Sequence, residues 1–454
     1  MNSLRKRIIV VSLLAAACRA GPPRAELPPT PGVAPSDTSC TLAASTVVSR
    51  DTVTLAVTAP VDPAHAPAPR NDAERLVFAQ LYESLLRVDC QGRALPALAR
   101  SWSQDGDRWT FALREGARFW DGAPVTAVDV VAAWRSRDSG LARVVTIADD
   151  HTLSVGKRAG GPDMPLELFA DPALAVTKPA PGGGWPIGTG RLWLTGAEAG
   201  TPDLLVARPV GHGGPGGPGG RGGLPVVKIT STPPDGARDA LDGGADMLVV
   251  DDPATLEYAA RLRGYTDAPL EWSRTYVLLV PAGERAGVGD LRLESLREAV
   301  HGDARPAEES DEKGHPWFTE LARCGLVGGR DAVEAGARRR RIVYNQADRS
   351  AADLAARLVG LGVLGRGTAA AGLPAAAFES ALRAGGDAGY VLELHARVYD
   401  ACRAAAVELP PWSSAGKVVP LLDVRSHAVL RRALPRLWSD WDGTLRFASP
   451  TASP

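Results

Sequence analysis

Side chains suited to holding a polar solute lie at the ends of two predicted strands and in nearby loops. Guanidinium and carboxylate groups pair with the charged ends of a ligand, and aromatic rings stack on it. The candidate ligand-binding residues are Asp62, Arg274, Tyr276, Glu393, His395, Asp400 and Trp412. Each also has a plainer interpretation as an ordinary surface or core residue, and burial is the commoner fate of a tryptophan. The chemistry that this set suggests is non-covalent binding.

Covalent catalysis has little support in the sequence. It contains no G-x-S-x-G, H-E-x-x-H or Walker A pattern. Its seven histidines are scattered, and none forms a metal-spaced pair on a predicted helix. The tract 211–223 contains a G-x-G-x-x-G spacing, but two intervening residues are prolines and no helix follows, so it predicts a flexible loop. We therefore expect no cofactor and no metal, and an enzyme is the least favoured alternative.

The charge balance gives no reason to expect a nucleic-acid partner. The 454 residues include 51 Lys+Arg and 52 Asp+Glu, a formal net charge of −1. The basic run 338–341 is short, and such runs more often belong to a solvated face or loop. The length exceeds what one hydrophobic core usually covers and predicts two or three domains.

The elements that would position these groups are most readable in the N-terminal third of the chain. Asn71 with Glu74 forms a capping-box pattern ahead of apolar residues at helical spacing, which predicts an amphipathic helix. Alternating apolar residues at 109–113 predict a strand with one covered face. A second capping pattern, Thr126 with Asp129, predicts the start of another helix. These residues describe an α/β scaffold, not a site.

The stretch 76–134 carries motifs in an order that few proteins share. It reads QLYESLL, then PALARSW, then WTFALREGARFWDGAPVTAVDV. This order resembles the extracellular solute-binding proteins, family 5, the oligopeptide-binding type that feeds ABC importers. The later turn at 186–190 is similar to that family's P-V-G-T-G-P-Y turn, although Arg191 and Leu192 replace its Pro and Tyr. The resemblance is dense from 53 to 282 and thin from 290 to 410.

The resemblance implies an α/β fold: a two-lobed periplasmic-binding-protein-like clamshell of the class II type, with mixed sheets and two hinge crossovers. We expect the strand 275–281 to make the first crossing and the strand 389–394 to return. The expected organisation is a signal peptide at 1–18, a Pro-rich tether at 19–50, lobe I at 51–282 with an inserted subdomain at about 70–185, a shortened lobe II at 283–388, and a return to lobe I at 389–454.

The function that the resemblance implies is capture of a peptide or similar small-molecule solute between two lobes, for delivery to an ABC permease. Asp62 lies on the loop that the family places at the cleft mouth. The family's return-strand motif G-W-x-x-D-x-x-D-P, which grips a peptide amino terminus, is lost in 392–400, where Trp and Asp-Pro are missing. Two alternatives therefore stay open: a degenerate binding lipoprotein that acts as a sensor or partner-binding module, and a carrier of nickel or haem. A monomer is expected.

The N-terminus carries an export signal. Three basic residues at 5–7 precede the apolar run 8–17, which is too short to span a bilayer, and Cys18 follows. The box 15–18 resembles a bacterial lipoprotein cleavage site, which predicts lipidation at Cys18 and attachment to a membrane surface. Ordinary signal-peptidase cleavage is the alternative. Either interpretation predicts a protein of the periplasm or cell envelope.

Four further cysteines are an even number in a chain predicted to enter an oxidising compartment, so disulfides are expected. They are Cys40, Cys90, Cys324 and Cys402. Three pairings are possible, and the sequence does not choose among them. Pairing Cys40 with Cys90 and Cys324 with Cys402 would keep each bridge within one half of the chain.

Overall fold

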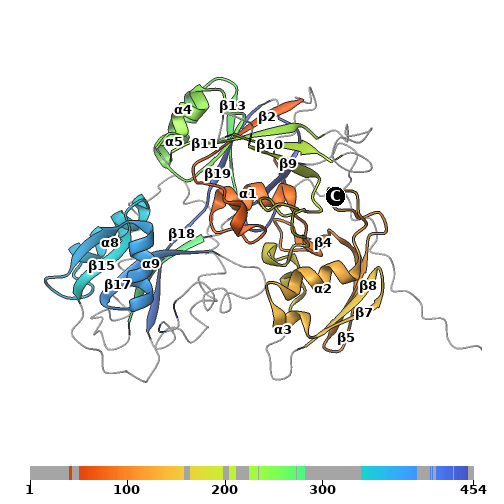
Figure 1. Cartoon of the computed structure of the whole chain (residues 1–454). Coiled ribbons are helices and arrows are strands. Elements are labelled where there is room, and N and C mark those ends of the chain that lie inside the picture. Colours follow the sequence, from red (N-terminus) through yellow and green to blue (C-terminus); the bar gives the residue numbers. More distant parts are fainter. Residues whose placement is uncertain are drawn as a thin grey trace, which may run out of the picture. The chain divides into compact units, whose positions relative to one another are not determined.

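The computed structural model describes residues 40–42, 51–157, 164–197, 204–210, 224–233, 235–271, 274–281, 339–395, 410, 412, 416–432 and 434–447 (Figure 1). The chain divides into the units Met1–Pro35 and Ser36–Pro454, and every described residue belongs to the second. The expected signal peptide, most of the tether, the helix expected at 291–300 and the acidic loop at 308–312 lie outside the described residues. Within the described ranges no helix is long and apolar enough to cross a membrane.

Lobe I is built on a seven-stranded mixed sheet of order β13-β19-β12-β2-β11-β10-β9. Its strands are β2 (Thr52–Val57), β9 (Leu192–Ala197), β10 (Leu204–Pro209), β11 (Val226–Ser231), β12 (Met247–Val250), β13 (Tyr265–Pro269) and β19 (His427–Arg431). Alternate residues of β2 face opposite sides of the sheet. Leu55 packs in the core that α1 (Asp72–Leu81) covers, and Ala56 packs in the core under α4 (Ala237–Asp242) and α5 (Pro253–Arg261) (Figure 1). Both faces are therefore covered.

The inserted subdomain has a four-stranded antiparallel sheet of order β5-β6-β8-β7. Its elements are β5 (Ala99–Asp105), β6 (Arg108–Leu113), α2 (Ala127–Arg135), α3 (Ser139–Ala142), β7 (Val145–Asp149) and β8 (Thr152–Gly156), beside the hairpin of β3 (Leu86–Val88) and β4 (Ala94–Pro96). The predicted capping box opens α2, because Asp129 accepts from the backbone of Thr126. Trp134 and Phe111 fill the core of this subdomain.

The segment 165–178, whose sequence predicts a short helix and a strand, forms two 3₁₀ helices instead, η2 (Leu166–Ala170) and η3 (Pro172–Leu174). Pro165 precedes the first 3₁₀ helix, and Pro172 is the first residue of the second. Proline has no backbone N–H, so it ends regular hydrogen bonding and favours short turns. The expected strand is reduced to one bridge between Lys178 and Ile187.

Lobe II is built on a five-stranded sheet of order β16-β15-β17-β14-β18. Its elements are β14 (Arg274–Val280), β15 (Arg339–Asn345), α8 (Arg349–Gly360), β16 (Ala369–Leu373), α9 (Ala375–Ala384), β17 (Asp387–His395) and β18 (Lys417–Val424). Leu278 of β14 packs in the core under α8, and Leu279 packs in the core under α9. The strand is buried on both faces, which explains why 275–280 is a continuous apolar run.

The chain returns to lobe I later than the sequence indicates. The expected return strand, 389–394, is β17, and it lies between β15 and β14 inside the sheet of lobe II. The passage back runs from β18 to β19, through residues 425–426. A run of apolar residues is equally consistent with a central strand and with a crossing strand, so its pattern does not distinguish the two.

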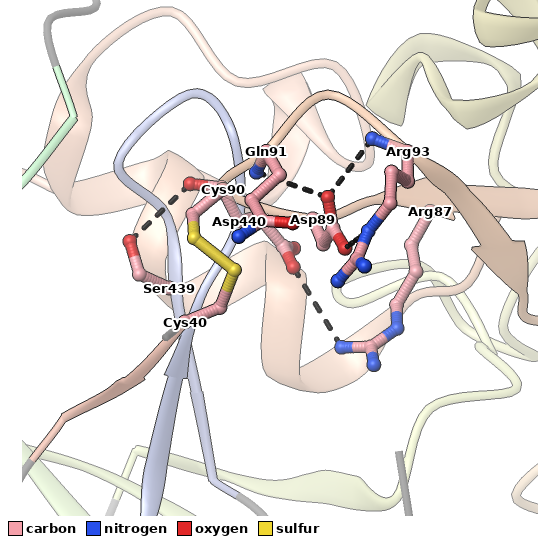
Figure 2. Close-up of a disulfide and its surroundings, with 8 residues drawn as sticks. All are labelled: Cys40, Arg87, Asp89, Cys90, Gln91, Arg93, Ser439 and Asp440. Carbon is pink, nitrogen blue, oxygen red and sulfur yellow. Dashed lines mark hydrogen bonds and ion pairs between the residues drawn. A yellow bond between two sulfur atoms is a disulfide. The ribbon is translucent and has the colours of Figure 1, made fainter. Parts of the chain in front are cut away.

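A covalent bridge fastens the beginning of the described chain to lobe I. Cys40 is bonded to Cys90, which is one of the pairings left open by the sequence. Figure 2 shows the bridge beside the carboxylate of Asp89, which accepts from Arg93, and beside Ser439, whose backbone N–H donates to the carbonyl of Cys40. The strand β1 (Thr41–Leu42) pairs with β20 (Leu437–Ser439), which pairs with β21 (Leu445–Phe447). Cys324 and Cys402 lie outside the described residues.

Breaking this bridge should destabilise the protein strongly. The two cysteines are 50 residues apart in sequence, and closing a loop of that size stabilises a fold by ~4 kcal/mol through the entropy of the unfolded chain. We expect Cys40→Ser to lower the free energy of unfolding by about that amount in urea titrations. Cys90→Ser and the double variant should lose equally much, because either change breaks the same bond. A single variant as stable as the wild type would contradict the assignment.

Candidate functional site

The candidate site is organised by Arg274, the first residue of β14, where the chain passes from the sheet of lobe I to that of lobe II. Its side chain is 7% exposed. One terminal nitrogen, Nη1, lies 3.2 Å from Asp72 Oδ2 and 3.1 Å from Glu393 Oε1. The other, Nη2, lies 3.4 Å from Asp251 and donates to Ser426 Oγ at 2.7 Å. The guanidinium therefore joins residues from α1, the end of β12, β17 and both passages between the sheets.

The electrostatics of Arg274 are decided by its three carboxylate neighbours. Burial alone would lower the pKa of the guanidinium, because desolvation disfavours the charged form. Attraction to Glu393, Asp72 and Asp251 overcomes that effect and raises the pKa above its ordinary value. The side chain is therefore charged at every physiological pH. Removing it would leave Glu393, whose side chain is 20% exposed, and the half-exposed Asp72 and Asp251 without their cation.

Tyr276 extends the cluster into lobe II. Its hydroxyl lies 3.0 and 3.1 Å from the two carboxylate oxygens of Asp348 and donates to them. Asp348 is also the N-cap of α8, where it accepts from the backbone N–H of Ala351 at 2.9 Å. Burial, and then the charges of Glu393 and Asp348, raise the pKa of Tyr276. Burial likewise raises the pKa of Asp348, although its two hydrogen bonds oppose the shift.

Among the described contacts of the cluster, carboxylates outnumber guanidinium groups. Four carboxylates, those of Asp72, Asp251, Asp348 and Glu393, surround one guanidinium. Within the described ranges no three His, Cys, Asp or Glu side chains are placed to hold a metal ion. What the arrangement can do chemically is bind a polar or positively charged group without forming a covalent bond.

The loop before α1 is shaped by the buried carboxylate of Glu74. This carboxylate accepts from the backbone N–H groups of Asp62 at 3.1 Å and Arg70 at 2.7 Å, and lies 2.6 Å from His65 Nδ1. Asn71 caps the helix as predicted, by accepting from Glu74 N at 2.8 Å. The reciprocal bond of the predicted capping box is replaced, because the Glu74 carboxylate turns towards the loop. Those donors lie 4 to 12 residues before Glu74, outside the three-residue spacing of the capping box, so that pattern did not indicate them.

Three of the predicted ligand-binding residues, Arg274, Tyr276 and Glu393, are brought together in the cluster. Asp62 instead accepts from Ala64 N at 2.8 Å and caps the 3₁₀ helix η1 (Pro63–His65), with half of its side chain exposed. His395 pairs with Arg274 in the strand register, and nothing further of its side chain is described.

The remaining two predictions lie elsewhere. Trp412 donates from Nε1 to the carbonyl of Leu382 at 2.8 Å, and its ring centroid is 5.7 Å from that of Tyr390, so its described contacts belong to the α9 side of lobe II. Asp400 lies outside the described residues.

The sequence did not single out four members of the cluster: Asp72, Asp251, Asp348 and Ser426. One local signal was available, because Asp251 follows a buried strand directly and Asp348 stands at a helix N-cap position. Polar residues at such element ends often face a binding site. Their convergence on Arg274 depends on long-range packing, which no local pattern encodes.

The titration of Asp348 should appear in the pH dependence of stability. Because the folded state raises its pKa above the ordinary 3.8, the stability that Asp348 contributes is fully present below the pKa of the unfolded chain. That contribution is lost as the pH rises through the folded-state pKa. Asp348→Asn keeps an oxygen for Ala351 N and removes the titration. The free energy of unfolding of the wild type minus that of the variant should therefore fall as the pH rises above the ordinary aspartate pKa of 3.8, as measured by urea titration.

The control for this measurement is Asp353→Asn on the same helix, whose side chain is exposed. The difference between the wild type and that variant should stay flat across the same range. A wild-type advantage over Asp348→Asn that grows with pH would contradict the assignment.

Comparison with known proteins agrees with this architecture. The family model of the bacterial extracellular solute-binding proteins, family 5 (middle region), matches residues 93–137. The periplasmic oligopeptide-binding protein OppA of Escherichia coli is 44% identical over 71 residues, which are 15% of this chain and 13% of that protein. The Escherichia coli murein peptide-binding protein MppA is 40% identical over 60 residues. These sequence matches span less than one sixth of either chain.

The solved structures cover far more of the molecule. The murein tripeptide-binding protein MppA of Escherichia coli superposes with a TM-score of 0.58 and 16% identity, over 85% of this chain and 95% of that one. OppA of Haemophilus influenzae, in complex with the peptide RPPGFSPFR, gives a TM-score of 0.58 and 16% identity, over 84% and 94%. The expected two-lobed α/β periplasmic-binding-protein fold is confirmed. By its matched segment this chain is similar to the bacterial extracellular solute-binding proteins of family 5, and it shares the fold of these solved structures.

Proposed function

We propose that this protein is exported and captures a peptide or similar small solute between its two lobes for an ABC-type importer, acting as a monomer. The observation that carries the proposal is the Arg274 cluster, in which one buried guanidinium contacts residues of both lobes where the chain passes between them. A protein that closes around a solute needs interactions of this kind at its hinge.

The two passages between the sheets are short. The first runs from the end of β13 at Pro269 to Arg274, and the second from the end of β18 at Val424 to His427. Hinges are usually a few residues at the ends of such elements, which absorb the change in backbone angles. Because Arg274 belongs to the first passage and bonds to Ser426 of the second, it ties both together.

A cluster rich in carboxylates suits a solute that carries a positive charge. An amino terminus or a basic side chain would pair with Glu393 or Asp348, and main-chain groups of an extended peptide would supply further hydrogen bonds. The Haemophilus influenzae OppA structure holds the peptide RPPGFSPFR, which carries two arginines. Apolar surface removed from water would add ~25 cal/mol per Å² before ordering costs.

A binding module that serves as a sensor is the second candidate. The sequence observation that favours it is the loss of the return-strand motif in 392–400. Such a protein would keep the solute site and lose its permease partner. Deleting the gene for this protein would then alter a response to the solute without slowing uptake of labelled solute.

Peptide capture is testable with the intact protein. Native mass spectrometry of protein purified from its own cell envelope should show a bound solute, and calorimetry against a pool of basic peptides should show saturable binding. Glu393→Gln should weaken that binding about tenfold, the effect of one charge-assisted hydrogen bond. Glu257→Gln is the matched control, because its side chain is 74% exposed on α5. Absence of any bound or added peptide from the wild type would refute this version of the proposal.

The lipid anchor is a separate proposal that rests on the sequence around Cys18. A thioether-linked diacylglycerol, together with the following Pro-rich tract, would hold the protein at a membrane surface within the cell envelope. Cys18→Ala should move the protein from the membrane fraction to the soluble fraction, as detected by immunoblotting. Ser36→Ala, a change of similar size in the tract, should leave fractionation as in the wild type. Unchanged fractionation of Cys18→Ala would refute the anchor.

A further inference from the structure

We infer that lobe I contains a second binding site, for a small organic oxyanion, in a cavity apart from the Arg274 cluster. The cavity has a volume of about 320 Å³. Its walls come from the end of α1, the β3–β4 hairpin, the start of β9 and the strands β20 and β21. None of the residues that line it belongs to the Arg274 cluster.

Arginine side chains dominate the charge of this cavity. Its charged lining residues are Glu83, Arg87, Arg114, Arg191 and Arg446. Glu83 accepts from Arg114 Nη2 with both oxygens at 3.0 Å.

One further carboxylate, Asp440, reaches these arginines from outside the lining. It pairs with Arg446 Nε at 2.5 Å and lies 3.7 Å from Arg87 Nη1. Four guanidinium groups minus the two carboxylates of Glu83 and Asp440 leave a surplus of two positive charges. Asp89 and Asp442 also attract Arg87 and Arg446, but each of these carboxylates is paired with a further arginine, Arg93 or Arg75, so the surplus is unchanged.

Two residues that line the cavity carry buried hydrogen-bond donors. In the part of the chain that the structure describes, neither Arg114 Nε nor Trp438 Nε1 has a hydrogen-bond partner. Both residues line the cavity, and the guanidinium carbon of Arg87 lies 4.4 Å from the Trp438 ring centroid. A buried donor left unpaired destabilises the folded state, and an acceptor that reaches it removes that cost. Carboxylate and phosphate oxygens accept hydrogen bonds and carry the complementary charge.

The electrostatic environment of Arg87 favours the binding of an anion. Burial lowers the pKa of Arg87, the nearby Asp440 opposes this effect, and Arg446 and Arg191 lower the pKa further. An anion bound among these groups would relieve the repulsion between the arginines. The apolar side chains of Leu95, Leu192, Leu224 and Phe447 line the same cavity and suit the carbon body of an organic ligand.

Arg191 distinguishes this cavity from the same region of the family that the turn resembles. It replaces the proline of the turn to which 186–190 is similar, and it is exposed at the first position before β9. Proline there would offer neither charge nor donor. An oxyanion site explains why an arginine, and not a turn-forming proline, stands beside the three other arginines.

The test is calorimetry on the full protein at constant ionic strength, with phenyl phosphate and inorganic phosphate as probes. We expect phenyl phosphate to bind, and to bind more tightly than inorganic phosphate because its ring contacts the apolar wall. Arg191→Gln should weaken binding of phenyl phosphate about tenfold, and Arg191→Lys should restore part of the loss. Trp438→Phe keeps the ring under Arg87, removes the donor, and should weaken binding severalfold.

The matched control is Arg208→Gln, because Arg208 is also exposed in lobe I but does not line the cavity. It should bind phenyl phosphate as the wild type does, and each variant should unfold at the wild-type temperature. Failure of the wild type to bind phenyl phosphate would overturn the inference. So would equal weakening by Arg191→Gln and Arg208→Gln, which would indicate general surface charge. Equal affinity for the two probes would overturn the assignment to an organic ligand. Peptide binding by Arg191→Gln should remain, which separates this site from the proposed function.

Discussion

The burial of one guanidinium between the lobes is the constraint on which the candidate site depends. A buried cation is tolerated only if carboxylates and hydrogen-bond acceptors surround it. Arg274 meets that requirement with groups that the chain supplies from positions as far apart as Asp72 and Ser426. The passage between the sheets, the first turn of α1 and the central strand β17 of lobe II must therefore be correctly placed at the same time. A substitution that displaces any of these elements changes the contacts of Arg274.

The same requirement extends to the groups that surround Arg274. Asp348 is held partly by its role as a helix cap, and Tyr276 by a strand buried on both faces. Burial raises the pKa values of both Tyr276 and Asp348. Fixed charges at a passage between two lobes favour one relative arrangement of those lobes. A solute that supplies its own charge changes which arrangement is favoured.

The sequence predicted the scaffold well where short-range patterns decide the structure. The caps at Asn71 and Thr126 and the alternation in β6 all involve residues within a few positions of one another, and the structure has each of them. The passage back to lobe I was misplaced because β17 and a crossing strand have the same apolar pattern. In the site, Arg274, Tyr276 and Glu393 were predicted from their places on strands. Asp251 and Asp348 were not, since their role depends on distances across 23 and 74 residues of chain.

The bond between Cys40 and Cys90 has a mechanical consequence. Residue 40 precedes every strand of the large sheets, and its bond leads directly into the turn beside Asp89 and Asp440 (Figure 2). A force applied to the chain on the N-terminal side of residue 40 therefore acts on the disulfide before it reaches β2. The load enters lobe I and bypasses both passages between the sheets.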